Sequence, residues 1–562
     1  MPRLLNESLK ENVFDLCKRI AGSHQIIAAC FYGPWVCGYA DKKSDVHVLL
    51  VLDKFRSKLR SYLKPLNGIN AFILTVDQGA FEGDVNQGLL GEFVTEKITF
   101  PYESIVNEKY LRRQEVKSKK RIILELLENI VLEFPELSHE LRIQPEYFMH
   151  EAMTRRARVF LPVTYTFLNM LRRDVRRKNV ESMMRGYLEA FSELAKEGQI
   201  TFSNEHIQIT DSLMNAIRGR KFRFPLFLKS FQRVALLHIL SVLSKMMKPL
   251  AYDEEVFTMS NRGFKSEELV FQLEDPKKYL LIPISHGFVT LSDKTGVKDF
   301  VRKTVPGEVL DMKIKEVGGV LNAVYLLTFQ RNHEKQKVIV KKFRDWYGFK
   351  WFPLALWALG TKTFAVLGRS RLEKEYAVNQ FLHSQGFPVP AILYFSPKQK
   401  LIFKNFIEGE NLTKIVKRII SHKKEEVTAE AALVREVGRK IAEAHRLGVA
   451  LGDCKPENII VTKDGKTFFV DLEQATRDGD GNQAWDVAEF LYYSGHYVSP
   501  VSSANAAVLI AKEFIKGYLE AGGKRETVRK AGSARYTKVF SIFTPPQVLL
   551  AVSNICKKTG DE

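Results

Sequence analysis

Cysteine is scarce in this 562-residue chain. The five cysteines are odd in number and no two stand in a C-x-x-C spacing; they are Cys17, Cys30, Cys37, Cys454 and Cys556. Disulfide frameworks and zinc ribbons both rely on paired, closely spaced cysteines. The composition therefore argues against both and fits a protein of the reducing cytoplasm.

Long apolar runs are also absent. The most apolar stretch, residues 349–368, is interrupted by lysine, proline and glycine, whereas a membrane-spanning helix needs roughly 18 apolar residues in succession. The N-terminus carries Glu7, Glu11 and Asp15, so it lacks the apolar centre of a secretory signal. We expect a cytoplasmic protein without a transmembrane segment.

Positive charge is abundant, with a net charge of +20, and such a field attracts phosphate-rich partners. Residues 111–250 hold 25 basic and 15 acidic side chains, half of the excess. Apolar residues recur there at helical spacing over 121–134, 146–177 and 182–197. We expect a basic helical module open to nucleic acid, in which residues 196–210 form two short strands like a winged-helix wing.

The C-terminal half contains a polar loop followed by two short strands. The loop carries Asp453, Lys455 and Asn458, and the second strand ends in Asp471. A Gly-Lys turn at residues 464–466 joins the strands and brings their ends together. Transfer of a γ-phosphoryl group needs metal-binding groups, a carboxylate that orients the attacking hydroxyl and a cation on the other phosphates. The loop and the second strand supply the first two.

These spacings resemble the protein-kinase-like superfamily over residues 309–500, and specifically its atypical branches: the RIO kinases, the kinase of the KEOPS tRNA-modification complex, and the aminoglycoside and choline phosphotransferases. The resemblance implies a two-lobed fold that uses ATP and Mg²⁺. By it, Asp453 is the catalytic base, Lys455 lies beside the transferred phosphate, and Asn458 and Asp471 hold Mg²⁺.

The same resemblance assigns the nucleotide-binding residues upstream. Gly318 and Gly319 form the glycine turn over the phosphates, and Lys341 in the following strand grips the α- and β-phosphates, with Lys342 as the alternative one residue on. Glu375 in the next helix pairs with that lysine and is favoured over Glu373 by its distance from the following glycine.

Several positions depart from the protein-kinase pattern. Asp471 is followed by Leu472 and Glu473 instead of Phe-Gly, and no A-P-E motif follows. Asp486, the expected brace of the catalytic loop, comes only about fifteen residues after Asp471. We therefore expect neither a phosphorylation-switched activation loop nor a large peptide-docking segment.

Residues Trp346–Trp357 hold three of the five tryptophans between Lys341 and Glu375. This aromatic segment is a candidate for contact with a partner or a membrane surface, so peripheral membrane attachment stays open. The alternative is that it packs against the protein's own N-terminal domains.

The N-terminal region predicts strands at 26–32 and 46–52 separated by a turn at Gly33. The turn and Asp45 resemble the minimal nucleotidyltransferase pattern, which uses paired carboxylates to hold metal ions. His47 stands where the second carboxylate belongs, and Asn70 where the third does. We expect a nucleotidyltransferase-like fold with lost catalysis, or an unrelated α/β domain.

The expected fold is therefore multidomain α+β, because chains of this length exceed a single core. The expected domains are an α/β nucleotidyltransferase-like domain over 1–110, the basic helical module over 111–250, a connector over 251–305 and the kinase domain over 306–562.

Three functions remain open. A serine/threonine protein kinase is favoured by the chain's size and its candidate partner-binding domains. A small-molecule or lipid-linked kinase is favoured by the glycine turn, Glu473 and the short route to Asp486. The third is a RIO-like ATPase switch or a nucleic-acid-binding module that uses the basic middle segment. The phosphate acceptor is thus an unidentified protein or small molecule.

Overall fold

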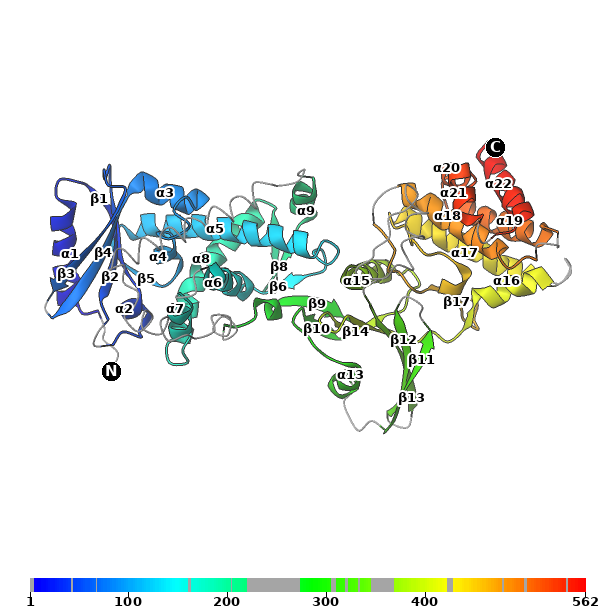
Figure 1. Ribbon diagram of the computed structural model, residues 1–562, viewed down its shortest axis with the longest axis horizontal. Coiled ribbons are helices and arrows are strands. Elements are labelled where there is room, and N and C mark those ends of the chain that lie inside the picture. The colour runs from blue at the N-terminus through cyan, green and yellow to red at the C-terminus, as the bar shows by residue number, and fades with distance from the viewer. Residues whose placement is uncertain are drawn as a thin grey trace. The chain divides into compact units, whose positions relative to one another are not determined.

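The computed structural model describes residues 5–41, 44–66, 68–159, 163–203, 205–219, 273–304, 310–318, 322–331, 334–344, 368–421, 428–477, 480–499, 503–541 and 544–561. The chain divides into two compact units, Met1–Leu281 and Ile282–Glu562 (Figure 1). Helices and strands are mixed throughout, which agrees with the expected α+β class. No helix in the described ranges is long and apolar enough to cross a lipid bilayer.

The first unit begins with a five-stranded sheet in the order β3-β4-β2-β1-β5. Strands β2 and β4 are parallel and the other neighbours are antiparallel. The strands are β1 (Ile26–Tyr32), β2 (Val46–Leu52), β3 (Leu59–Leu66), β4 (Ile69–Asp77) and β5 (Tyr102–Val106). Both strands predicted around the Gly33 turn are confirmed with their predicted bounds.

Helices cover both faces of this sheet. Helix α1 (Glu7–Ala21) packs on one face through Val13 and Leu16, and α3 (Gln78–Gln87) packs on the other through Phe81 and Val85. The two short helices are α2 (Pro34–Cys37) and α4 (Glu96–Thr99). Strand β2 is apolar apart from one histidine because its side chains enter a core on either face.

Helices dominate the rest of the first unit. They are α5 (Glu108–Glu133), α6 (Glu146–Val159), α7 (Val163–Met170), α8 (Arg176–Lys196), α9 (Asp211–Arg218) and the 3₁₀ turn η1 (Pro276–Tyr279). The prediction of one helix over 146–177 is wrong, because α7 ends at Met170 and turns at 171–175 separate it from α8, which begins only at Arg176. The Asn179 side chain of α8 donates to the Met170 carbonyl oxygen at 3.0 Å, so it satisfies a backbone group left free where α7 ends.

A small sheet ends this unit. Strands β7 (Ile200–Ser203) and β8 (His206–Ile209) form the predicted hairpin, and β8 pairs with β6 (Arg142–Ile143). Leu280 and Leu281, the first residues of β9 (Leu280–Ile284), pair with β6 on its other side.

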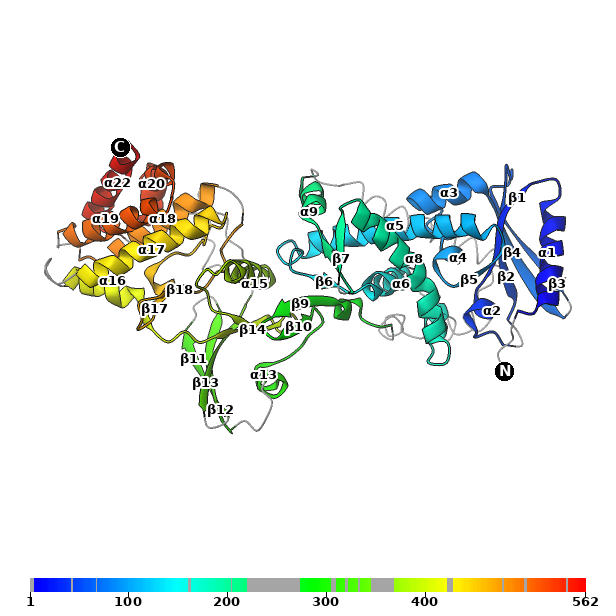
Figure 2. The same ribbon diagram turned by 180° about the vertical axis from the view of Figure 1, so that it is seen from behind.

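The second unit contains a five-stranded antiparallel sheet in the order β11-β12-β13-β15-β14 (Figure 2). Its strands are β11 (Leu310–Gly318), β12 (Ala323–Arg331), β13 (Glu334–Lys342), β14 (Ile392–Ser396) and β15 (Leu401–Asn405). Helix α15 (Gly368–Ser384) contacts β14 and β15. Strand β10 (Gly287–Thr290) and helix α13 (Val297–Thr304) precede the sheet, and Phe300 of α13 stacks on Phe403 of β15 at 4.2 Å between ring centroids.

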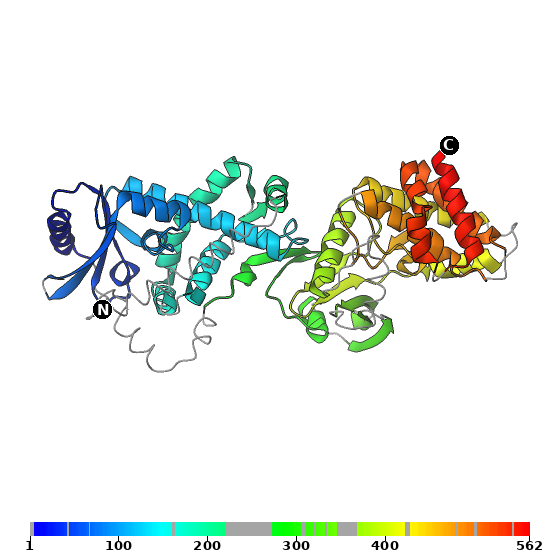
Figure 3. The same cartoon turned by 45° about the horizontal axis from the view of Figure 1, so that its top comes forward.

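The remainder of the second unit is a helical bundle, yellow to red in Figure 3. Its helices are α16 (Leu412–Ser421), α17 (Thr428–Arg446), α18 (Asp480–Gly495), α19 (Asn505–Glu520), α20 (Arg525–Ala531), α21 (Ala534–Phe540) and α22 (Pro546–Asp561). The small sheet β16 (Glu410–Asn411), β17 (Ile459–Val461) and β18 (Thr467–Phe469) joins the bundle, and the 3₁₀ turn η3 (Pro456–Asn458) precedes β17.

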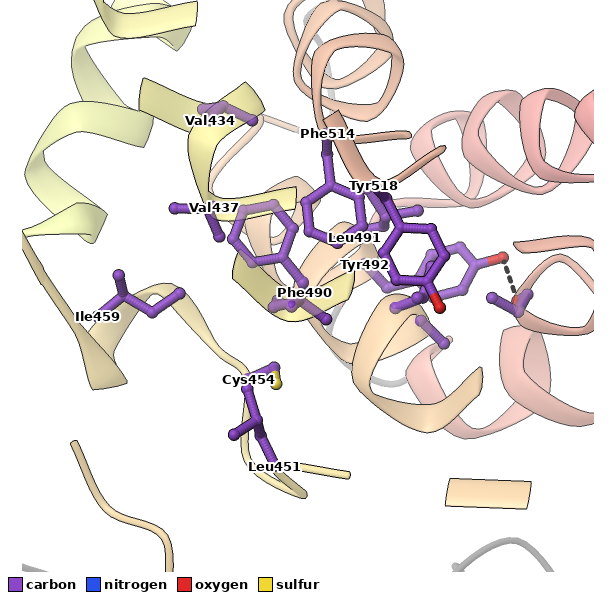
Figure 4. Packing of buried hydrophobic residues seen from close by; sticks show 14 of the residues in the cluster. Val434, Val437, Leu451, Cys454, Ile459, Phe490, Leu491, Tyr492, Phe514 and Tyr518 are labelled. Carbon is purple, nitrogen blue, oxygen red and sulfur yellow. Dashed lines mark hydrogen bonds between the residues drawn. The ribbon is translucent and has the colours of Figure 1, made fainter. Parts of the chain in front are cut away.

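Tight packing between α17 and α19 fixes the centre of the bundle. A Cβ atom at Gly438 would lie 2.2 Å from the Phe514 carbonyl oxygen, and one at Gly517 would lie 1.9 Å from the Arg435 carbonyl oxygen. Only glycine fits at these two positions without moving a backbone. Figure 4 shows Phe490 and Phe514 beside each other near Val437, with ring centroids 4.5 Å apart. This packed core supports the loop that carries Asp453.

Candidate active site

Lys341 contacts three carboxylates in the second unit. It lies on β13, is 4% exposed, and its Nζ atom lies 2.6 Å from Asp471 Oδ1, 2.7 Å from Glu375 Oε2 and 2.9 Å from Glu473 Oε2. Its neighbour Lys342 points to the other face of the strand and is exposed. The structure thus places Lys341, and not Lys342, in contact with the carboxylates.

Glu375 reaches this lysine from helix α15. It is fully buried and also accepts a hydrogen bond from Lys404 of β15, a second buried lysine. Glu373 instead pairs with Arg369, one helical turn earlier on the same helix, at 2.9 Å. A buried carboxylate is tolerated when cations surround it, and Glu375 has two.

Asp471 and Glu473 follow strand β18, and with Glu375 they form a carboxylate cluster. One oxygen from each of the three lies within 4.8 Å of the others. Asp471 adopts a left-handed backbone conformation, with φ of +65°, a strained geometry for a residue other than glycine. Carboxylate oxygens gathered this closely are the donor type that Mg²⁺ prefers, so the residues fit that ion.

The carboxylates and lysines shift one another's acidity. Burial alone would lower the pKa of Lys341, but the charges of Asp471, Glu375 and Glu473 outweigh burial and raise it well above its ordinary value. Burial would raise the pKa of Asp471, but the charge and hydrogen bond of Lys341 lower it instead. Burial and the Asp471 charge raise the pKa of Glu473 despite the nearby Lys341. Of these two carboxyl groups, Asp471 therefore ionises at lower pH than Glu473.

The catalytic loop lies between α17 and β17. Lys455 Nζ lies 3.1 Å from Asp453 Oδ2, and Asn458 Nδ2 donates to the Asp453 carbonyl oxygen at 3.1 Å. Although burial lowers the pKa of Lys455, the charges of Asp453, Glu489 and Asp471 raise it above its ordinary value. The loop and Asp471 therefore share one electrostatic environment.

Asp486 of α18 holds this loop in place. Its carboxylate accepts the backbone N–H groups of Leu451 at 2.6 Å and of Gly452 at 2.7 Å, and it contacts His445 Nε2 at 3.1 Å. It is fully buried, and Gly452 has φ of +81°. The prediction that Asp486 braces the catalytic loop is confirmed, since the carboxylate anchors the two residues immediately before Asp453.

Arg371 joins three separate segments. Its guanidinium is fully buried and donates to Asn322 Oδ1 at 2.8 Å and to Glu473 Oε1 at 3.1 Å, as well as to the Arg344 carbonyl oxygen. Asn322 Nδ2 donates in turn to Glu473 Oε2 at 2.6 Å. Arg371 thus links helix α15 directly to Asn322, which follows the glycine turn, and to Glu473, which follows β18.

The structure describes only part of the glycine turn and none of the aromatic segment that the sequence predicted. Gly318 ends β11, whereas its partner Gly319 and the aromatic segment Trp346–Trp357 lie outside the described residues.

In the first unit, the Gly33 turn, Asp45 and His47 lie together where β1 and β2 meet. A Cβ atom at Gly33 would lie 2.7 Å from His47 Nδ1, and both residues line a small cavity of about 80 Å³ with Lys97. Burial, with a smaller effect of the Lys97 charge, lowers the His47 pKa to about 3. Asn70 is exposed on β4. Among the described residues of this unit, acidic, cysteine and histidine side chains form no group of three metal ligands.

Comparison with known proteins agrees with this geometry. Residues 331–508 match the lipopolysaccharide kinase (Kdo/WaaP) family. KEOPS complex subunit Bud32 of Pyrococcus abyssi is 27% identical over 173 residues, 29% of this chain and 72% of that protein. The second unit carries an atypical kinase domain. A probable serine/threonine-protein kinase, the BUD32 homolog of Archaeoglobus fulgidus, is 27% identical to this kinase domain over 161 residues, 29% of this chain and 72% of that protein. The kinase domain makes the chain a phosphotransferase.

Sequence reasoning missed four residues of the kinase site: Asn322, Arg371, Lys404 and Glu489. Glu489 of α18 accepts the backbone N–H of Cys454 at 2.8 Å. The sequence could have indicated Asn322, because it follows the glycine turn. It could also have indicated Arg371, because it lies one helical turn before Glu375. Lys404 gave no signal, because a lysine in a short apolar strand is equally typical of an edge exposed to solvent.

Proposed function

We propose that the kinase domain transfers the γ-phosphoryl group of ATP to a serine or threonine hydroxyl of a protein, with Mg²⁺. The observation that supports this most directly is the buried contact of Lys341 with Asp471 and Glu375. A lysine held by a helix glutamate and facing a metal-binding aspartate is the arrangement that positions ATP phosphates in kinases. Gly318, at the end of β11, would let the backbone approach the phosphates closely.

Asp471, which contacts Lys341, and Asn458 of the catalytic loop would hold the metal, because each side chain carries an oxygen ligand. Bound Mg²⁺ would neutralise charge on the phosphate oxygens during transfer. Glu473 lies within ligand distance of the same cluster but is already engaged by Arg371, Asn322 and Lys341. Its role in this proposal is to position Lys341.

Asp453 would accept the proton of the attacking hydroxyl. The acceptor O–H bond breaks as its oxygen bonds to the γ-phosphorus, and the bond from that phosphorus to the β-phosphate oxygen breaks with its electron pair leaving on ADP. Lys455, 3.1 Å from Asp453, would stabilise negative charge on the transferred group. The Asp486 brace keeps Asp453 in place without touching the reacting atoms.

The acceptor class rests on the name of the Archaeoglobus fulgidus relative, a probable serine/threonine-protein kinase. A second candidate is the hydroxyl of a saccharide or another small molecule. Two observations favour it: the matching family is described as lipopolysaccharide kinases, and only residues 472–479 separate Asp471 from α18. So short a connection offers little surface for docking an extended peptide.

For the first unit, we propose a nucleotidyltransferase-like domain that no longer catalyses nucleotide transfer. Asp45 is the one carboxylate that remains of the sequence pattern, and burial lowers the pKa of His47 to about 3. Glu96 also lines the cavity with His47, but it is paired with Arg156 at 2.5 Å. One carboxylate does not hold the two metal ions that this chemistry uses.

Transfer from γ-labelled ATP with Mg²⁺ tests the kinase proposal. The full chain is compared with Asp471→Asn, and Asp464→Asn on the exposed β17–β18 turn is the matched control. A protein mixture, a lipopolysaccharide preparation and RNA are offered separately. Label in protein that is lost only in Asp471→Asn supports the protein-kinase proposal. Label in saccharide alone supports the second candidate, and free phosphate alone would instead indicate an ATPase switch.

A further inference from the structure

The kinase sheet carries a cavity on the face opposite Lys341. It has a volume of about 650 Å³ and lies among β12, β13, β14, α13 and the β9–β10 hairpin. Cavities of roughly 300–1,000 Å³ are the usual size for small-molecule sites in proteins. No residue of the Lys341 cluster lines it.

Strand register places the cavity on the back of the catalytic sheet. Lys341 pairs with Ile402, and Val338, three residues earlier on β13, pairs with Asn405 on the other face. Phe329 and Arg331 share that second face, because they pair with Gln336 and Glu334 in an unbroken register. These residues form the back face: Phe329, Arg331, Gln336, Val338 and Asn405.

The opposite wall comes from α13 and the segment before it. Phe300 packs against Phe403 and Tyr394 with ring centroids 4.2 and 5.7 Å away, and this holds α13 on the sheet. Lys303, one turn later, lines the cavity and donates to Thr295 Oγ1 at 2.6 Å. Aromatic rings therefore form much of the interior, and a lysine stands at its border.

Charge in the cavity is unbalanced toward positive. Asp293 accepts hydrogen bonds from Tyr394 at 3.0 Å and from Thr295 at 3.0 Å, and it lies 3.4 Å from Lys303, so its charge is already engaged. Arg331 has no such partner: its Nε atom is buried and meets no hydrogen-bond acceptor among the described residues. An unpaired buried donor costs free energy that an incoming acceptor would recover.

We propose that this back-face cavity binds a small organic anion with a carboxylate, sulfonate or phosphate head on an apolar or aromatic body. The head accepts hydrogen bonds from Arg331 and Lys303, and the body lies between Phe300 and Phe329. Charge-assisted hydrogen bonds to guanidinium give this site its preference for an anion over a neutral molecule of the same shape. The proposal does not rest on the identity of the phosphate acceptor or on the kinase reaction.

Two fluorescent probes test it on the full chain: the anion 1-anilinonaphthalene-8-sulfonate and its neutral analogue N-phenyl-1-naphthylamine. The wild-type protein should bind the anion more tightly, and Arg331→Ala and Lys303→Ala should each weaken anion binding by about tenfold while changing binding of the neutral probe little. Arg302→Ala, an exposed neighbour on α13, is the matched control.

Saturating ADP with Mg²⁺ should leave the anionic probe bound, because the cavity lies on the opposite face from Lys341. Displacement by ADP would place the probe in the catalytic cleft and overturn the proposal. Equal losses for both probes, or equal effects of Arg302→Ala and Lys303→Ala, would also overturn it. If Arg331→Ala fails to fold by circular dichroism, Lys303→Ala, at a partly exposed position, decides the question.

Discussion

The ammonium of Lys341 lies 2.6 Å from Asp471 Oδ1, so the strand lysine and the acid after β18 share a direct charge contact. The same ammonium serves Glu375 and Glu473. One buried cation therefore balances much of the charge of three carboxylates, with Lys404 and Arg371 balancing the rest.

Replacing this cation should disturb both catalysis and stability. We expect Lys341→Met to lower kcat/KM for ATP by roughly 10²–10³-fold, the usual effect of losing one preorganised electrostatic contact. The variant should also be less stable at pH 7 and recover stability as the pH falls, because protonation relieves repulsion among the carboxylates.

Steady-state kinetics measures the loss of activity. Urea unfolding at several pH values between about 5 and 8 measures the recovery of stability. Lys342→Met is the control, since that side chain is exposed on the other face of β13. Similar losses in the two variants would contradict the assignment of Lys341.

Arg371 and Glu473 should behave as a unit. Arg371→Met should destabilise the protein by roughly 3–5 kcal/mol, because it leaves a buried carboxylate short of a partner. The double variant Arg371→Met/Glu473→Leu should regain a large part of that loss. A double-mutant cycle by urea unfolding tests the coupling, and strictly additive effects would show that the two side chains act independently.

Asp486→Ala should separate kcat from KM. The substitution removes the acceptor of two backbone N–H groups next to Asp453, so the catalytic carboxylate loses its alignment while the ATP phosphate contacts of Lys341 stay intact. We expect kcat to fall by about 10²-fold with little change in the KM for ATP. Asn482→Ala, on the first turn of α18, should change neither. A KM effect as large as the kcat effect would argue against a positioning role.

His47 should make the first unit less stable in acid. Its pKa falls from an ordinary 6.5 to about 3 in the folded protein, so only the unfolded chain takes up its proton between these values. Stability is therefore lost as pH drops through that window, by about 1.4 kcal/mol per pH unit. His150, with a pKa near 4, adds a similar slope.

His47→Gln should reduce the slope of unfolding free energy against pH by the contribution of one titrating group. Hydrogen exchange of the β2 amides measures this pH dependence between about pH 4 and 6.5. That range lies within the window between the folded and the ordinary pKa of His47. His383→Gln, at an exposed position on α15, is the control. An unchanged slope in His47→Gln would mean that His47 stays accessible to protons.

The sequence alone predicted the elements that local chemistry determines. The apolar runs at 26–32 and 46–52 became β1 and β2, and the Gly-Lys turn at 464–466 joins β17 and β18. The kinase family was also predictable, because Asp453, Asn458 and Asp471 stand at fixed spacings on one hairpin and its preceding loop. Apolar spacing alone did not reveal the turns at 171–175, which divide the expected helix over 146–177.

Long-range contacts were not predictable from spacing. Lys404 reaches Glu375 only because β15 lies beside β13 in the sheet, and Arg371 meets Asn322 across 49 positions of the chain. Likewise, nothing local in residues 287–304 indicates that they cover the back of the kinase sheet. Such contacts depend on the fold as a whole, and one sequence carries little information about them.

The three-way contact of Arg371, Asn322 and Glu473 has a consequence for molecular evolution. A single replacement in it strands a buried charge or amide, whereas a concerted exchange for apolar residues of similar volume is tolerated. Homologues should therefore either keep all three residues or lose them together, and an alignment should show these positions covarying more strongly than Lys342 does with any of them.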